Sequence, residues 1–192
     1  MCVIGILIAI LAAAIIIGVI AYVIYTYNRF KALEVATQAT LGQIRVALRK
    51  RLDMITQLAE ATREYAIFEK ETLENITKMR AAIATATPEQ IRDIDRESRA
   101  ILGRIIAVAE AYPTLRTAEA VSKLMDSIKS IEDEIARLRY TYNNIVQEYN
   151  TRIRTFPSNI IAGMIGAREL PYLHVGGREI EERPRIRLRE EK

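Results

Sequence analysis

An apolar run of 25 residues near the N-terminus constrains this chain more than any other feature. From Val3 to Tyr27 the sequence contains no Asp, Glu, Lys or Arg. About 20 apolar residues are enough to carry an α-helix across roughly 30 Å of hydrocarbon. The sequence therefore predicts a transmembrane anchor at residues 1–27, with the lipid bilayer as a partner of the chain.

A cleaved signal peptide is the alternative interpretation of this run. Such a peptide has a basic start, a shorter apolar core and a cleavage site of small residues. Here no basic residue precedes the run, and the run is too long. Tyr22, Tyr25 and Tyr27 lie at its C-terminal end, where aromatic rings favour the membrane interface. We therefore expect a retained anchor.

The distribution of basic residues predicts the orientation of the anchor. No Lys or Arg precedes the run, and six basic residues follow it: Arg29, Lys31, Arg45, Arg49, Lys50 and Arg51. The side of a membrane helix that is rich in Lys and Arg usually faces the cytoplasm. We expect a single-pass protein of the cell membrane, with a short N-terminus outside and the larger domain in the cytoplasm.

The residues that follow the anchor have helical periodicity. The clearest stretch is 117–156, where apolar positions alternate at gaps of three and four: Val121, Leu124, Ile128, Ile131, Ile135, Leu138, Tyr142, Ile145 and Tyr149. This 3.5-residue period is typical of a coiled-coil seam with left-handed packing. A second helix is expected from Thr87, because Thr87-Pro88-Glu89-Gln90 is a capping box with proline at the first helical position.

The stretch 28–86 is harder to divide. Its apolar stripe loses phase near Tyr65-Ala66-Ile67-Phe68, which indicates a turn or kink between a long helix at 28–66 and a short one at 69–86. One unbroken helix of almost 60 residues is the alternative. With the turn, the chain is all-α: an N-terminal transmembrane helix, then an up-and-down antiparallel four-helix bundle of two long and two short helices within residues 28–173.

A short apolar helix is expected near 158–166, with Ser158 as its N-cap. It lies either beside the anchor at the bilayer surface or against the base of the bundle core, and the sequence leaves both open. Residues 174–192 are charged and predict an exposed tail.

Several runs of residues resemble the LemA family of single-pass membrane proteins. They include 27–30, 48–55, 69–74 and 108–113, and the strongest extends from Arg139-Tyr140 to the stretch 156–163. The resemblance covers about residues 27–173. Thr56 departs from it, because the family usually has proline there, and we therefore expect regular helix at this position. The resemblance implies an anchor with its short end outside and a helical bundle inside, and it implies no particular activity.

Nothing in the sequence predicts catalysis or a cofactor. His174 is the only histidine and Cys2 the only cysteine. Nucleophilic catalysis usually needs a base next to the nucleophile, and metal sites usually need several His or Cys ligands. We therefore expect no enzyme, no cofactor and no metal.

The Tyr-Asn pairs are the most distinctive polar feature. Tyr142-Asn143 and Tyr149-Asn150 are seven residues apart, and Tyr27-Asn28 repeats the pair at the membrane end. One interpretation is a set of buried hydrogen-bonding layers; the other is a polar groove that receives a partner helix. The candidate residues for interaction or structure are Tyr27, Asn28, Arg49, Arg51, Tyr142, Asn143, Tyr149, Asn150, Phe156, Pro157, Ser158 and Asn159.

The basic run Arg49-Lys50-Arg51 lies about 33 Å beyond the anchor if the helix is upright. That is several Debye lengths from the lipid headgroups, so acidic side chains on a neighbouring helix are its expected partners. A net charge of only +4 does not favour nucleic acid as a partner.

Two functions fit these features. The first is a membrane-anchored scaffold that self-assembles into a homo-oligomer through helix packing. The second is an adaptor that binds and regulates a membrane protein partner, such as a protease.

Overall fold

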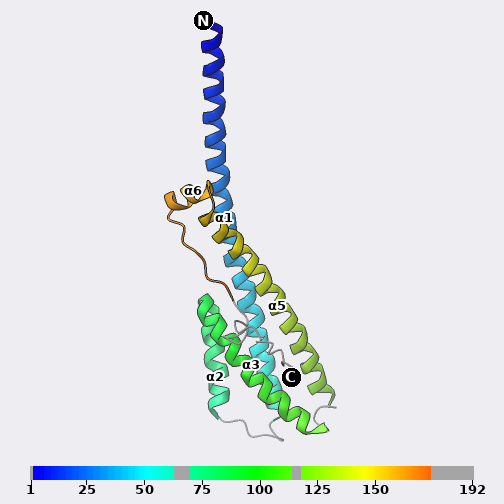
Figure 1. Ribbon diagram of the computed structural model, residues 1–192. Helices are drawn as coiled ribbons and strands as arrows, with labels where there is room; N and C mark the ends of the chain where they lie inside the picture. The colour runs from blue at the N-terminus through cyan, green and yellow to red at the C-terminus, as the bar shows by residue number, and fades with distance from the viewer. Residues whose placement is uncertain (1, 63–69, 114–117, 174–192) are drawn as a thin grey trace, which may run out of the picture.

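The computed structural model describes residues 2–62, 70–113 and 118–173, and all its regular structure within these ranges is helical. The elements are α1 (Cys2–Ala61), α2 (Lys70–Ala82), the 3-10 turn η1 (Ile83–Thr85), α3 (Pro88–Ala111), α5 (Glu119–Arg154) and α6 (Ser158–Met164). The predicted all-α chain with a long N-terminal apolar helix is confirmed (Figure 1). The predicted tail at 174–192 lies outside the described residues.

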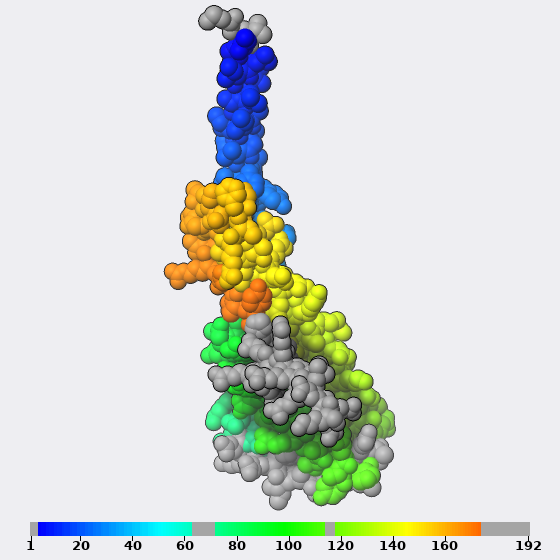
Figure 2. Space-filling view, in the orientation of Figure 1, coloured from blue at the N-terminus to red at the C-terminus, as the bar shows by residue number. Residues whose placement is uncertain are grey.

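Helix α1 is unbroken over 60 residues, from Cys2 to Ala61. Its first part stands alone as a rod that projects from the rest of the molecule (Figure 2). This part is long and apolar enough to cross a membrane, and none of its most apolar stretch is buried. The apolar part of α1 therefore continues without a break into the part that packs in the domain.

Helix α5 runs antiparallel to the second half of α1. Arg29 pairs with Glu148 near the span, whereas Arg51, further along α1, pairs with Glu132, earlier on α5. Figure 1 shows the two helices side by side over most of the length of α5. These two long helices form the frame on which the shorter helices pack.

The alternative of one unbroken helix over 28–86 is wrong. Asp53 on α1 pairs with Arg80 on α2. In a continuous helix these residues would lie about 40 Å apart, at 1.5 Å per residue, so the chain must reverse between them. α1 already ends at Ala61, and the turn predicted at 65–68 lies outside the described residues.

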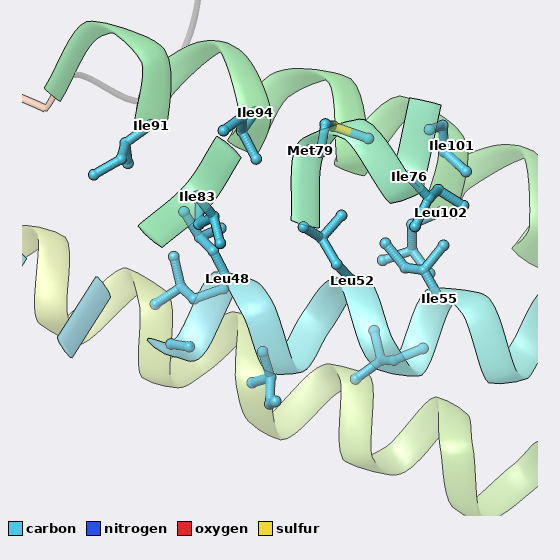
Figure 3. Close-up of a cluster of buried hydrophobic side chains, with 14 of the residues drawn as sticks. Leu48, Leu52, Ile55, Ile76, Met79, Ile83, Ile91, Ile94, Ile101 and Leu102 are labelled. Atoms are coloured by element: carbon cyan, nitrogen blue, oxygen red, sulfur yellow. The ribbon is translucent and has the colours of Figure 1, made fainter. Parts of the chain in front are cut away.

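The core forms where α1, α2 with η1, α3 and α5 bring their apolar faces together, and Figure 3 shows part of it. The labelled side chains are Leu48, Leu52, Ile55, Ile76, Met79, Ile83, Ile91, Ile94, Ile101 and Leu102. The predicted capping box that starts α3 is confirmed: the N–H of Gln90 donates to Thr87 Oγ1, and the N–H of Thr87 donates to Gln90 Oε1. This box fixes the residue at which α3 begins.

The four-helix bundle is not confirmed in the predicted form. The described residues contain five α-helices, and α3 packs on α1 and α2. It reaches α5 through long charged side chains, as in the 2.7 Å pair between Asp95 and Arg139. The space between α3 and α5 therefore holds ionic contacts in addition to apolar packing.

The buried stripe of α5 includes six of the nine positions of the predicted heptad seam. Val121, Ile128, Ile131, Ile135, Tyr142 and Tyr149 are buried, whereas Leu124, Leu138 and Ile145 are only partly buried. The buried residues Ile128, Arg139 and Asn150 are spaced by 11, a period close to that of a straight helix. Arg139 is thus a buried charged position beside the seam, where it pairs with Asp95.

Candidate functional site

A cluster of charged side chains lies inside the domain, where α1, α3 and α5 meet. Arg51 is completely buried; its Nη1 donates to Glu132 Oε1 and its Nη2 to Asp95 Oδ1, each at 2.7 Å. Arg139 Nη1 donates to the other carboxylate oxygen of Asp95 at 2.7 Å. Arg99 contacts the same two acids, Asp95 at 3.3 Å and Glu132 at 3.2 Å. One ionic network thus joins all three helices.

Within this cluster Arg51 is held most completely. Its Nη2 also donates to the backbone oxygen of Asp95 at 3.1 Å and to Ser98 Oγ at 2.6 Å. Burial lowers the pKa of Arg139, an effect that nearby Asp95 opposes. Among the described residues, neither Arg51 Nε nor Arg139 Nε has a hydrogen-bond partner. The expected pairing of the basic run with acids is therefore confirmed for Arg51, whereas Arg49 is exposed.

The cluster is too tightly packed to bind a ligand. The cavity that adjoins Asp95 and Arg139 has a volume of about 10 Å³, and Leu173 forms part of its wall. Such a space holds about one water molecule at most. In the ranges that the structure describes, no group of three or more His, Cys, Asp or Glu is placed to hold a metal ion.

The segment 167–173 is fixed on α5 by two asparagines. Asn150 Nδ2 donates to the oxygen of Leu170, and the N–H of Leu170 donates back to Asn150 Oδ1, both at 2.9 Å. Asn143 makes the same pair of bonds with Leu173, at 3.0 and 2.8 Å. We call this segment the strap; the two asparagines bind its backbone, and the side chain of Leu173 is buried in the core.

The spacing of the two asparagines matches the strap. Seven residues of α-helix rise about 10.5 Å, and three residues of extended chain cover about 10 Å. Asn143 and Asn150 therefore lie opposite Leu173 and Leu170, and the strap runs antiparallel to α5. This relationship explains the seven-residue repeat of the Tyr-Asn pairs.

Tyr142 binds the strap between the two asparagines. Its ring is buried and its hydroxyl donates to the oxygen of Pro171 at 3.1 Å. Burial, with a smaller contribution from Glu89, raises the pKa of Tyr142 to about 12. Of the two interpretations of the Tyr-Asn pairs, the structure agrees better with buried hydrogen-bonding layers. Their hydrogen-bond partner is the chain's own strap, however, and not a facing helix.

A second set of contacts joins α1 to α5 just beyond the anchor. The Arg29 guanidinium donates to both carboxylate oxygens of Glu148, at 2.7 Å for the shortest contacts. This bond lowers the pKa of Glu148, and Arg152 adds a contact at 3.1 Å. Phe30 and Tyr149 meet edge to face, with ring centroids 5.5 Å apart. We call these residues the junction, because they fix α5 to α1 where the anchor ends.

The other pair of the Tyr-Asn repeat does not join these contacts. Tyr27 and Asn28 are both exposed, although they lie directly before the junction residues Arg29 and Phe30. The repetition in sequence therefore does not extend to a shared structural role.

The prediction that Ser158 caps the short apolar helix is wrong. Pro157 is the N-cap residue of α6, and Ser158 Oγ contacts the carbonyl oxygens of Arg152 at 2.7 Å and Thr155 at 3.0 Å. Those carbonyls belong to the C-terminal end of α5, which otherwise lacks helical partners. Ser158 therefore closes α5. Phe156, Pro157 and Asn159 are exposed around it.

Helix α6 lies between the junction and the anchor. Its inner residues Ile161 and Ala162 are buried, and Ala162 packs in the cluster of Phe30, Leu33 and Tyr149. Gly166 follows with φ 65°, a backbone conformation that favours glycine, and there the chain turns back into the strap. The expectation that this segment covers the base of the core is met by its inner face.

Sequence reasoning missed the partners of the candidate residues. No sequence pattern distinguished the charged residues that form the cluster with Arg51, because charged residues are common in amphipathic helices. They are Asp95, Glu132 and Arg139. Arg139 lies directly after Leu138 and leaves the regular spacing of the apolar stripe intact, so the stripe gave no sign of its burial. Nothing local marks Leu170 or Leu173, because the asparagines recognise their backbone.

Comparison with known proteins places the chain among related sequences. The model of the LemA family matches residues 40–188. The magnetosome protein MamQ 2 of Paramagnetospirillum magneticum is 24% identical over 184 residues, which cover 82% of this chain and 68% of that protein. Protein LemA of Metamycoplasma hominis is 27% identical over 121 residues, 62% of this chain and 55% of that protein.

Proposed function

The chain belongs to the LemA family, and from that premise we propose that it is a membrane-anchored helical scaffold without catalytic activity of its own. It stands in the cell membrane with its short N-terminus outside, and it holds a bundle of two long and two short helices in the cytoplasm. Copies associate laterally into a homo-oligomer through helix packing. The names of its relatives state no reaction and no ligand.

One observation carries the proposal: α1 is a single helix from the anchor to the core of the domain. Residues 41–59 of this helix supply core side chains, among them Ile44, Leu52 and Ile55. A flexible tether would leave the domain free to rotate and tilt. A continuous helix instead transmits the position of the anchor to the domain, which is what a scaffold requires.

The distribution of exposed apolar side chains supports association at the membrane. In the described part of the domain, large exposed apolar residues are dispersed, as with Val35 on α1 and Tyr140 on α5. They gather instead on the anchor and around α6. A large apolar surface usually marks an interaction site, so the surface of the anchor favours lateral helix contacts within the bilayer over contacts through the far end of the domain.

Mass measurement of the full chain tests self-assembly. We expect a defined oligomer in mild detergent and cross-linked multimers of the same size in the native membrane. A strictly monomeric protein in both settings, at high concentration, would exclude the scaffold.

An adaptor for a membrane enzyme is the second candidate. The strap supports it, because the Asn143 and Asn150 contacts to backbone would accept an extended segment of another chain equally well. Cross-linking in the native membrane separates the two functions. A second protein recovered in fixed ratio supports the adaptor, and recovery of this chain alone supports the scaffold.

A further inference from the structure

The residues around α6 form a charge-free segment beside the anchor. From Thr155 to Ala167 there is no Asp, Glu, Lys or Arg. Charged residues stand at both ends, and Arg154 pairs with Glu169 across the base of the segment at 2.6 Å. The two charged ends of the segment therefore lie side by side, and the apolar residues between them lie on the side that faces the anchor.

The outer face of this segment is strongly exposed. Ile160 and Met164 are four residues apart on α6 and share a face, with 56% and 77% of their surface exposed; Phe156, just before the helix, is 81% exposed. The inner face is buried against the junction. No other part of the described domain presents large apolar side chains so openly at such short spacing.

Contacts with the anchor set the depth of this face. An apolar crevice of about 480 Å³ lies between the anchor and α6; its walls include Ile15, Val19 and Val23 on one side and Pro157 and Ile160 on the other. A hydrocarbon core of roughly 30 Å takes up about 20 residues of helix, so a span that begins near Val3 ends close to Tyr22. The crevice thus lies at the domain-side boundary of the bilayer.

We propose that α6 and the turn before it lie in the domain-side leaflet, with Phe156, Ile160 and Met164 in contact with lipid acyl chains. Apolar faces of interfacial helices insert to the depth of the headgroup and acyl boundary. Arg154 and Arg168, both exposed, lie at the ends of the segment, where basic side chains reach headgroups. The domain then has two membrane attachments, the anchor and α6, which together fix its tilt.

The absence of tryptophan from the sequence allows a direct test with single-tryptophan variants of the full chain. The reporter is F156W. Y22W, within the span, is the control for a residue in lipid; Y140W, which replaces a tyrosine that is 71% exposed on α5, is the control for a residue in water. Each protein is reconstituted into phosphatidylcholine vesicles with and without brominated acyl chains, which quench tryptophan on contact.

The expected result is loss of most of the F156W emission in brominated vesicles, as for Y22W, and a shift of its emission to shorter wavelength. Y140W should show neither effect. An I160W variant should repeat the result, since both residues belong to one face. Quenching of Y22W with F156W and I160W unaffected would overturn the proposal. A wavelength shift that disappears on dilution into excess lipid, without quenching, would instead assign the face to a second copy of the chain.

Discussion

Asn150 and Leu170, twenty residues apart in the sequence, exchange two hydrogen bonds in which a side-chain amide pairs with a backbone amide. The same arrangement recurs between Asn143 and Leu173. The strap is therefore fixed to α5 by main-chain recognition, in the way that one β-strand recognises the edge of another.

Replacement of Asn150 by alanine should release the strap. The N–H and C=O of Leu170 lose their partners, and each unsatisfied group that stays buried costs about 1–3 kcal/mol. We expect a lower free energy of unfolding in urea and faster trypsin cleavage after Arg168, which lies in the strap. Asn144, six positions earlier on the same helix, is exposed, and N144A is the matched control. Equal cleavage rates in both variants would show that the two bonds do not hold the strap.

Replacement of Arg51 by methionine should destabilise the domain strongly. The carboxylates of Asp95 and Glu132 would each lose the positive charge of Arg51. Loss of one member of a buried ion pair costs about 3–5 kcal/mol. R49M, two positions away and exposed, should change stability by less than about 0.5 kcal/mol. Urea unfolding of both variants measures the difference. An R51M protein as stable as R49M would mean that the cluster contributes specificity and no net stability.

The sequence predicted the elements better than their partners. Periodicity identified the helices, because burial of one face leaves a regular trace; the capping box at Thr87 located the start of α3 for the same local reason. The heptad seam correctly named residues that are buried as far as Tyr149, but it did not predict the burial of Arg139, which depends on Asp95 on another helix. The role of Ser158 was reversed, because a serine between two helices can serve either end, and only the path of the chain decides which carbonyl groups lie near it.

Alkaline pH should loosen the strap through Tyr142. Burial raises the pKa of its hydroxyl from an ordinary value of 10.0 to about 12, so the folded state retains this proton more tightly than the unfolded state. The associated stability is complete below pH 10 and is lost as pH rises from 10 towards 12. We expect the urea midpoint to fall across this window in the wild type. In Y142F the decrease in urea midpoint that comes from ionisation of the Tyr142 hydroxyl should be absent. The variant starts from a lower stability, because the hydrogen bond to Pro171 is missing. An identical pH dependence in both proteins would contradict the assignment.

The rigid connection through Tyr27 can be tested by an insertion of three glycines directly after it. Glycine costs about 1 kcal/mol per residue in a helix, so α1 should lose its continuity there while the apolar run before it stays intact. Membrane insertion should be unchanged, as judged by resistance to carbonate extraction, and the yield of cross-linked oligomer should fall.

An insertion of three alanines is the matched control, because it shifts the register equally but keeps the helix. If only the glycine variant loses assembly, rigidity is what matters; equal loss in both would assign the effect to register. Full assembly in both variants would mean that the anchor acts only as a tether, and the scaffold would then need another way to position its domain.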